Sequence, residues 1–171
     1  IPLGLTVGTV DCLAKGTLPI ILAKMTGQDI SVQVLVGIAL ICGHNWSVFI
    51  RFTGGRGIAT SIGILIGLYL WIELIIMGVL FGLIGRLIVK DTSLWTFASM
   101  ITLPLLAYLV MEPLAIRWGV SSIVVISILK RVTANWEPVP RGHKWYQILI
   151  NRIILDRDIS NRDSWTTRTN G

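Results

Sequence analysis

The stretch from Gly43 to Ser61 carries residue types that could hold a phosphate group. Three of the four residues 54–57 are glycine, and they surround Arg56. Glycines at the start of a helix let backbone N–H groups turn toward an anion, which the helix dipole also favours. Arginine could close this cradle with a bidentate fork, and hydroxyls one helical turn later could donate further hydrogen bonds. The candidate phosphate ligands are Gly54, Gly55, Arg56, Gly57, Thr60 and Ser61. The alternative is a tight surface turn whose arginine reaches lipid headgroups.

Two polar residues, His44 and Asn45, end the apolar run that precedes this stretch. Polar side chains in such a place are costly to bury without hydrogen bonds, so we expect them to face a polar cavity or to bond the loop backbone. Loop scaffolding is the favoured role for His44, since no carboxylate adjoins it in sequence to support a general base. One histidine does not supply a metal site, so we expect neither a metal nor a cofactor.

Two further pairs combine charged and polar side chains. Asp11 and Lys15 lie four residues apart, on one face of a helix. They form either an ion pair that neutralises both groups in the membrane, or a unit in which Asp11 orients Lys15 toward the phosphate site. Arg131 and Asn135 share a face if the last apolar helix continues that far. Basic residues at the end of a span are, however, expected from membrane topology alone.

The elements that must position these residues are membrane helices. Of 171 residues, 53% are hydrophobic and only 14% are charged, and apolar runs follow one another from residue 1 to residue 130. A spanning helix needs about 20 mostly apolar residues. We predict an all-α, polytopic transmembrane helix bundle with six spans, at 10–25, 31–49, 57–70, 71–89, 94–111 and 113–130. The third is short enough to be a helix shielded from lipid by its neighbours.

The distribution of basic residues predicts the orientation. Six alternating spans put most lysines and arginines on one side, leaving Lys24 and Arg117 on the other side and Lys15 inside the first span. By the positive-inside rule that basic side, with the candidate site and the C-terminus, is cytoplasmic. The net charge of +6 therefore indicates topology and affinity for membrane lipids rather than nucleic-acid binding.

The chain divides into a transmembrane domain, residues 1–135, and a cytoplasmic tail, residues 136–171. Apolar residues at helical spacing predict an amphipathic helix at 144–158, either lying in the membrane interface or packing on the membrane domain. Both cysteines, Cys12 and Cys42, fall in apolar segments, where we expect buried thiols. Because there is no starting methionine, we expect a longer protein upstream.

At these residues the sequence resembles the bacterial PlsY family of membrane acyltransferases. The resemblance runs from about Val10 to Asn135. It rests on Gly43-His44 followed by the run Phe52 to Thr60, on Asp11, Lys15, Gly16 and Pro19, and on Arg131 with Asn135. The spans agree with the last six of the family's seven, and the family's first helix and first loop are absent. Arg56 stands at a family lysine, Val132 at a histidine and Ser47 where proline is common.

The resemblance implies transfer of a fatty acyl group from acyl-phosphate to the 1-hydroxyl of glycerol 3-phosphate, which forms lysophosphatidic acid for phospholipid synthesis at the bacterial plasma membrane. It implies catalytic roles for Arg56 and Asn135, and it adds Lys15 and Arg131 to the phosphate ligands. Asp11, His44 and Asn45 would support them. No Ser-His-Asp or Cys-His pattern is recognisable, so we expect direct attack by the substrate hydroxyl.

Two other functions fit the same residues. Charged groups within spans also suit a transporter of a phosphorylated solute. The departures from the family pattern suit a non-catalytic homologue that binds lipid. A CDP-alcohol phosphotransferase is excluded, because its series of spaced aspartates for metal is not present.

Overall fold

The computed structural model describes residues 2–88, 91–137 and 144–160, and the regular elements in these ranges are helices. The elements are α1 (Pro2–Val10), the π-helical η1 (Asp11–Thr17), α2 (Leu18–Met25), α3 (Ile30–Asn45), the 3-10 turn η2 (Val48–Ile50), α4 (Ile58–Gly67), α5 (Trp71–Met77), the π-helical η3 (Gly78–Ile84), α6 (Gly85–Ile88), α7 (Thr92–Leu109), α8 (Leu114–Thr133), the 3-10 turn η4 (Ala134–Trp136) and α9 (Trp145–Leu155). Within these ranges an isolated bridge between Ser47 and Thr53 is the one β-type contact. The predicted all-α class is confirmed for this part of the chain.

The helix ends differ from several predicted bounds. The first helix begins at Pro2 rather than at residue 10, because α1, η1 and α2 follow one another without a break. α3 ends at Asn45 rather than at 49, since the chain turns there into a loop closed by the Ser47–Thr53 bridge. Arg51 and Phe52 in that loop have left-handed φ values of 53° and 59°. This loop joins the end of α3, with His44 and Asn45, to the glycine segment 54–57. It lets that segment fold back onto the end of α3.

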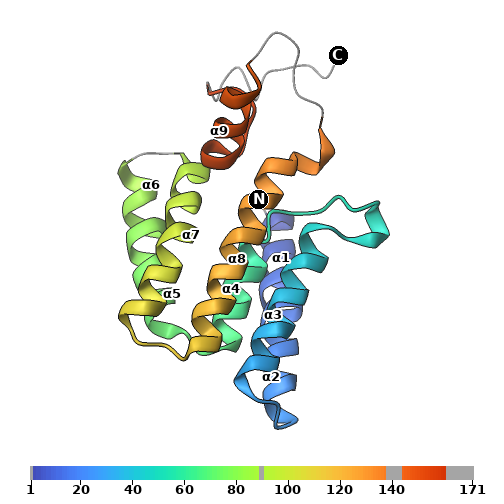
Figure 1. Ribbon diagram of the computed structural model, residues 1–171, viewed down its shortest axis with the longest axis vertical. Coiled ribbons are helices and arrows are strands. Elements are labelled where there is room, and N and C mark those ends of the chain that lie inside the picture. Colours follow the sequence, from blue (N-terminus) through green and yellow to red (C-terminus); the bar gives the residue numbers. More distant parts are fainter. Residues whose placement is uncertain (1, 89–90, 138–143, 161–171) are drawn as a thin grey trace.

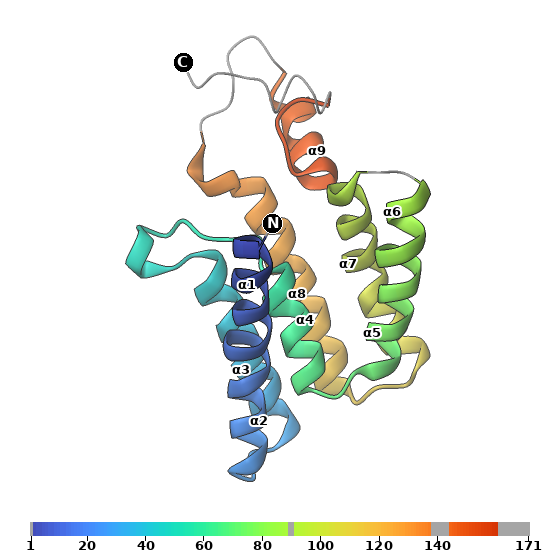
Figure 2. The ribbon, with the colours of Figure 1, turned by 180° about the vertical axis from the view of Figure 1, so that it is seen from behind.

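α4 and α8 lie between two groups of helices (Figures 1 and 2). On one side are α1, α2 and α3, and on the other are α5, α6 and α7. α4 contacts η1, α3 and α5, while α8 contacts α3 and α7. The approach of η1 to α4 is close because Gly16 and Gly63 meet there without side chains. Buried residues that include Ile20, Ile41, Ile64 and Val120 fill the core between these helices.

Among the described residues, two helices are long and apolar enough to cross a membrane. They are Leu3–Met25, with 23 residues, and Thr92–Leu109, with 18. Ile30–Asn45, Ile58–Gly67 and Trp71–Leu80 are apolar but shorter. A bilayer core of about 30 Å needs about 20 residues of helix, so the short ones cross it only with help from their neighbours. Helices suited to a membrane are therefore present, and the arrangement in six spans stays a prediction.

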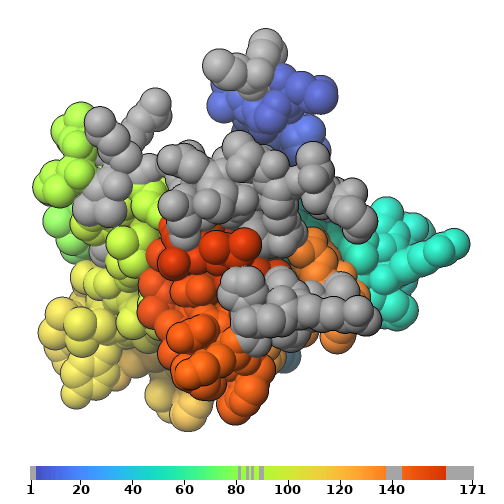
Figure 3. All heavy atoms as spheres, turned by 90° about the horizontal axis from the view of Figure 1, so that it is seen from above, coloured from blue at the N-terminus to red at the C-terminus, as the bar shows by residue number. Residues whose placement is uncertain are grey.

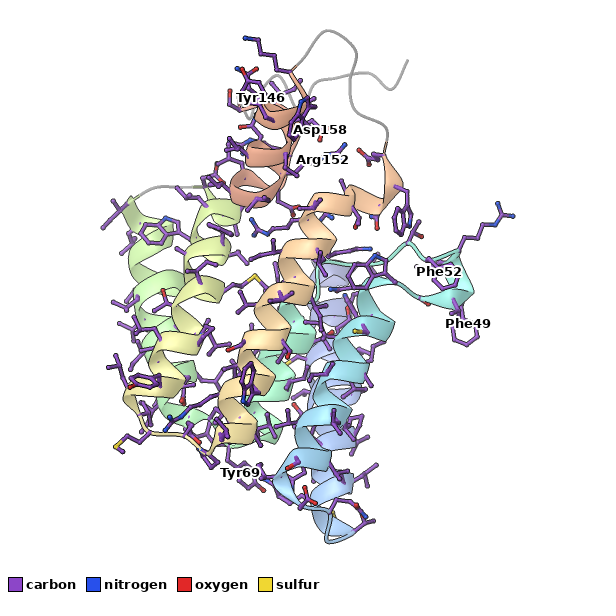
Figure 4. All side chains as sticks on the ribbon, in the orientation of Figure 1. Phe49, Phe52, Tyr69, Tyr146, Arg152 and Asp158 are labelled. Carbon is purple, nitrogen blue, oxygen red and sulfur yellow. The ribbon has the colours of Figure 1, made fainter. Side chains whose placement is uncertain are left out.

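α9 lies at the end of the bundle where α3 and α8 end and where α4 and α7 begin (Figure 1). It contacts α7 and α8, and its buried side chains are Ile148 and Arg152. Viewed from above, α9 lies between α7 on one side and the loop of residues 46–53 on the other (Figure 3). Figure 4 shows Phe49 and Phe52 at the tip of that loop, pointing away from the bundle. This end of the molecule carries the predicted site.

Candidate active site

The glycine loop, residues 54–57, packs tightly on the carboxyl end of α3. A Cβ atom at Gly54 would collide with the backbone oxygens of His44 and Asn45, and one at Gly55 would collide with the His44 imidazole. Gly57 has a left-handed φ of +73°, and a Cβ atom there would lie 2.7 Å from Asn45 Oδ1. Only glycine fits these positions without strain. His44 and Asn45 thus form the surface that carries the loop.

Lys130 and Asn135 tie the glycine loop to α3 and α8. Lys130 is fully buried, and its Nζ donates hydrogen bonds to the backbone oxygen of Asn45 and, at 2.6 Å, to Oδ1 of Asn135. The same Oδ1 accepts a hydrogen bond from the Gly54 N–H at 3.2 Å. One ammonium group and one amide therefore fix the loop's position.

Asn135 reaches the loop from a left-handed turn. α8 ends at Thr133, and Ala134, Asn135 and Trp136 have φ values of 43°, 58° and 67°. Such values are uncommon outside glycine and often mark functional sites. The helix does not continue to Asn135, so the condition for Arg131 and Asn135 to share a helical face is not met, and the turn directs Asn135 back toward Lys130.

Arg56 is held at two of its nitrogens. Its Nη1 donates to the backbone oxygen of Lys130 at 3.2 Å, and its Nε lies 3.0 Å from Oδ2 of Asp156, just after α9. Burial raises the pKa of the Asp156 carboxyl above its ordinary value, although the neighbouring Arg56 and Arg131 guanidinium groups act to lower it. Arg56 is therefore a partly exposed cation at the junction of the glycine loop, α8 and the C-terminal segment.

Several buried polar atoms beside the loop lack a hydrogen-bond partner within the described residues. They include Oγ1 of Thr60, Oγ of Ser61 and both side-chain polar atoms of Asn45. The first turn of α4 also has no side-chain cap. Buried polar atoms are nearly always hydrogen-bonded in folded proteins, and an uncapped helix start offers free N–H groups. This arrangement suits an anionic ligand.

Lys15 and Asp11 lie on η1, which packs against α4. Their side chains form an ion pair at 2.6 Å, and the Lys15 side chain is 57% exposed. Asp11 Oδ1 also lies 3.9 Å from Nδ1 of His44. The adjoining Gly16 packs against the backbone oxygen of Thr60. The pair is thus next to the predicted site, within a π-helical segment of a kind that is frequent at functional sites.

Arg131 is 4% exposed and directs its fork at backbone oxygens. Its Nη1 donates to Ile153 at 2.8 Å and to Ile154 at 3.1 Å, and its Nη2 donates to Ser93 at 3.1 Å. These bonds join α8 to the end of α9 and the start of α7. Arg131 therefore lies close to Asp156 and Arg56, but its donors are engaged with α9 and α7.

Sequence reasoning missed Lys130 and Asp156. Lys130 belongs to a basic pair that membrane topology explains equally well, so its burial gave no signal in the sequence. Asp156 lies 100 residues from Arg56. No local pattern indicates a contact over that separation.

A cavity of about 760 Å³ opens beside the start of α4. Its polar lining includes Ser61, Asp91 and Thr92, and its deeper lining is apolar, with residues such as Leu103 and Ile123. The cavity lies among α4, α5, η3, α7 and α8. An apolar cavity with a few polar groups at one end suits a ligand with a polar head and an alkyl chain.

Comparison with known proteins points to one family. Residues 1–139 match the family model described as glycerol-3-phosphate acyltransferase. Glycerol-3-phosphate acyltransferase 5 of Dehalococcoides mccartyi is 34% identical over an alignment, gaps included, of 174 residues. The alignment covers 97% of this chain and 72% of that protein. Glycerol-3-phosphate acyltransferase of Pseudomonas putida is 40% identical over 97 residues, covering 56% of this chain and 50% of that protein. No solved structure matches the chain.

Proposed function

Because this chain belongs to the glycerol-3-phosphate acyltransferase family, we propose that it transfers an acyl group from acyl-phosphate to the 1-hydroxyl of glycerol 3-phosphate. The products are lysophosphatidic acid and inorganic phosphate. The observation that carries the proposal is the glycine loop at the uncapped start of α4, held by Lys130 and Asn135 beside the unpartnered Thr60 and Ser61 hydroxyls. Both substrates carry a phosphate group, which is the chemistry this arrangement recognises.

The chemistry requires an attack by the substrate hydroxyl on the acyl carbonyl carbon. The new bond joins that carbon to the glycerol oxygen, and the bond between the carbon and the phosphate oxygen breaks. The leaving phosphate takes the hydroxyl proton. Arg56 and the N–H groups of the glycine loop stabilise the negative charge on the phosphate and on the developing oxyanion, and Asn135 and Lys130 fix the loop that presents them. The Lys15 ammonium, which Asp11 orients, offers hydrogen-bond donors from η1.

The acyl chain of the donor occupies the cavity among α4, α5, η3, α7 and α8. Ser61 lines this cavity and lies one turn from the glycine loop. One donor molecule therefore places its phosphate on the loop and its acyl chain in the cavity. The apolar walls replace the lipid around the chain. The two long apolar helices suit a location in a membrane, where an acyl chain is soluble.

The membrane arrangement completes the proposal. Six spans place the glycine loop, the end of α8 and the C-terminal tail on the cytoplasmic side of a bacterial plasma membrane. Residues 1–135 form the membrane domain and residues 136–171 the tail. Glycerol 3-phosphate then enters from the cytoplasm, while the acyl donor enters from the bilayer.

Reconstitution in vesicles separates this function from transport and from simple binding. The full protein is supplied with labelled glycerol 3-phosphate, with and without acyl-phosphate. We expect the label to appear in lysophosphatidic acid only when acyl-phosphate is present. Labelled glycerol 3-phosphate that accumulates unmodified inside the vesicles would indicate a transporter, and bound lipid without either result would indicate a non-catalytic homologue.

Gly78→Phe is expected to shorten the acyl chain that the enzyme prefers. Gly78 lines the cavity, and a Cβ atom built there meets nothing within 4 Å, so a ring at this edge of the cavity displaces no neighbouring helix. Each methylene excluded from an apolar site costs about 0.8 kcal/mol of transfer free energy. The measurement is kcat/KM for acyl-phosphates of increasing chain length, and we expect the longest donors to lose at least tenfold relative to the shortest.

Gly8→Phe is the matched control for this change. Gly8 is also open to space, on α1 and outside the cavity. Its chain-length profile should equal that of the unchanged protein. An unaltered profile in Gly78→Phe, in a protein that folds normally, would show that the acyl chain lies elsewhere.

A further inference from the structure

Helix α9 and the turn after it are fastened to the membrane domain by arginines. Besides the bonds of Arg131, Arg152 donates to the backbone oxygens of Val132 and Glu137, and it pairs with Asp158 at 2.5 Å. Arg157 pairs with Asp91, at the start of α7, at 3.0 Å. Figure 4 shows Arg152 and Asp158 together on the side of α9 near α8. The turn is thereby fixed at the place where Asp156 meets Arg56.

Asp156 is an unusual residue for a surface turn. It follows α9 in a left-handed conformation, with φ 54°, and its side chain is only 17% exposed. Oδ2 contacts Arg56, while Oδ1 is buried with no hydrogen-bond partner among the described residues. A buried carboxylate with an unpartnered oxygen is costly for stability. Asp156 therefore does not add to the stability of the fold, which points to a functional reason for its contact with Arg56.

We propose that Asp156 is a positioning residue, which holds the guanidinium of Arg56 in the orientation that acyl transfer requires and so makes the C-terminal segment part of the active site. The inference rests on the function proposed above. With Nε at Asp156 and Nη1 at the Lys130 backbone oxygen, the planar guanidinium has one orientation left. No described residue accepts a hydrogen bond from Nη2, which stays available for phosphate. A lysine at position 56 offers a single nitrogen and could not meet both partners and a phosphate in a fixed plane.

Asp156→Asn is the test, because asparagine keeps the shape and tolerates the left-handed backbone but removes the charge. We expect kcat to fall about tenfold, since small misplacements of a charge-stabilising group are costly in the transition state. KM for glycerol 3-phosphate and for acyl-phosphate should change less than threefold, because Arg56 and its charge remain.

Asp158→Asn is the matched control. It makes the same change, aspartate to asparagine, in the same turn. The buried ion pair that it breaks is the one with Arg152, and the pair of Asp156 with Arg56 stays intact. We expect it to lower the unfolding temperature while kcat stays within twofold of the unchanged protein. Equal losses of kcat in the two variants would show that only the docking of α9 matters, and they would overturn the inference.

A double-mutant cycle with Arg56→Lys tests the contact itself. Lysine lacks the plane that Asp156 orients, so Asp156→Asn should change kcat less than twofold in that background. Additive losses would contradict a positioning role. A lower KM with unchanged kcat in Asp156→Asn would also overturn it, because Asp156 would then be a competitor of the substrate phosphate. If the protein without any substitution showed no acyl transfer, the proposed function itself would be refuted.

Discussion

Arg56→Ala is expected to lower kcat/KM for acyl transfer by a factor of about 10²–10³, the usual effect of removing one donor to a developing negative charge. Arg56 is the cation of the glycine loop, and its side chain is 29% exposed, so it can reach a bound phosphate. Alanine leaves the N–H groups of the loop in place, which is why some activity should remain. The measurement is initial rates over a range of both substrates, with the purified protein in detergent or lipid.

Two checks make the Arg56→Ala result specific. The helix content should be close to that of the unchanged protein, because Lys130 and Asn135 hold the loop independently, while the unfolding temperature should fall because Asp156 loses its ion-pair partner. Arg56→Lys keeps the charge and should retain more activity than alanine does. Unchanged kcat/KM in a folded Arg56→Ala protein would remove the glycine loop from the reaction.

Lys130→Met is expected to reduce kcat/KM by a similar factor of about 10³ and also to lower the unfolding temperature. The ammonium is the common donor to Asn45 and Asn135, and the methionine side chain has similar length but no donor. The buried Asn45 backbone oxygen loses this partner, at a cost of about 1–3 kcal/mol. Asn135 Oδ1 keeps its bond to the Gly54 N–H but loses the ammonium that fixes its position, so the loop is held less firmly in the geometry that stabilises charge.

Lys24→Met separates loss of the site from loss of any interhelical lysine. Lys24 donates to the backbone oxygen of Gly67 at 3.1 Å and contacts the Tyr69 ring. Figure 4 shows Tyr69 at the opposite end of the molecule from Arg152. This variant should lose stability but keep kcat/KM within about twofold. If Lys130→Met behaved in the same way, Lys130 would be a structural residue with no part in positioning the loop.

Much of the site was predictable because it lies in local patterns. Three glycines around an arginine, at the start of an apolar helix, indicated either an anion cradle or a tight surface turn, and the polar pair His44 and Asn45 favoured the cradle. The cost of unpaired polar groups predicted a polar cavity or hydrogen bonds to the loop for His44 and Asn45; the loop packs on both residues, and the Asn45 side-chain atoms have no partner among the described residues. The all-α class followed from composition, since apolar runs in lipid must satisfy their own backbone hydrogen bonds.

The parts that escaped prediction depend on backbone turns and long-range contacts. The left-handed turn at 134–136 contains no glycine, so nothing indicated that Asn135 folds back toward Lys130. Arg131 and Asn135 would share a helical face only if the helix continued, and α8 ends at Thr133. The ion pair of Arg56 with Asp156 depends on the docking of α9, to which Arg131 contributes. These features arise from tertiary packing, and residue spacing does not report it.

The central claim is that phosphate leaves as the acyl group is transferred, and its most direct test follows both products at once. The full protein in lipid is supplied with glycerol 3-phosphate and either acyl-phosphate or acyl-CoA. We predict that acyl-phosphate yields lysophosphatidic acid and inorganic phosphate in equal amounts, and that acyl-CoA yields neither. Lysophosphatidic acid formed from acyl-CoA alone, or phosphate released without any acylated product, would contradict the account.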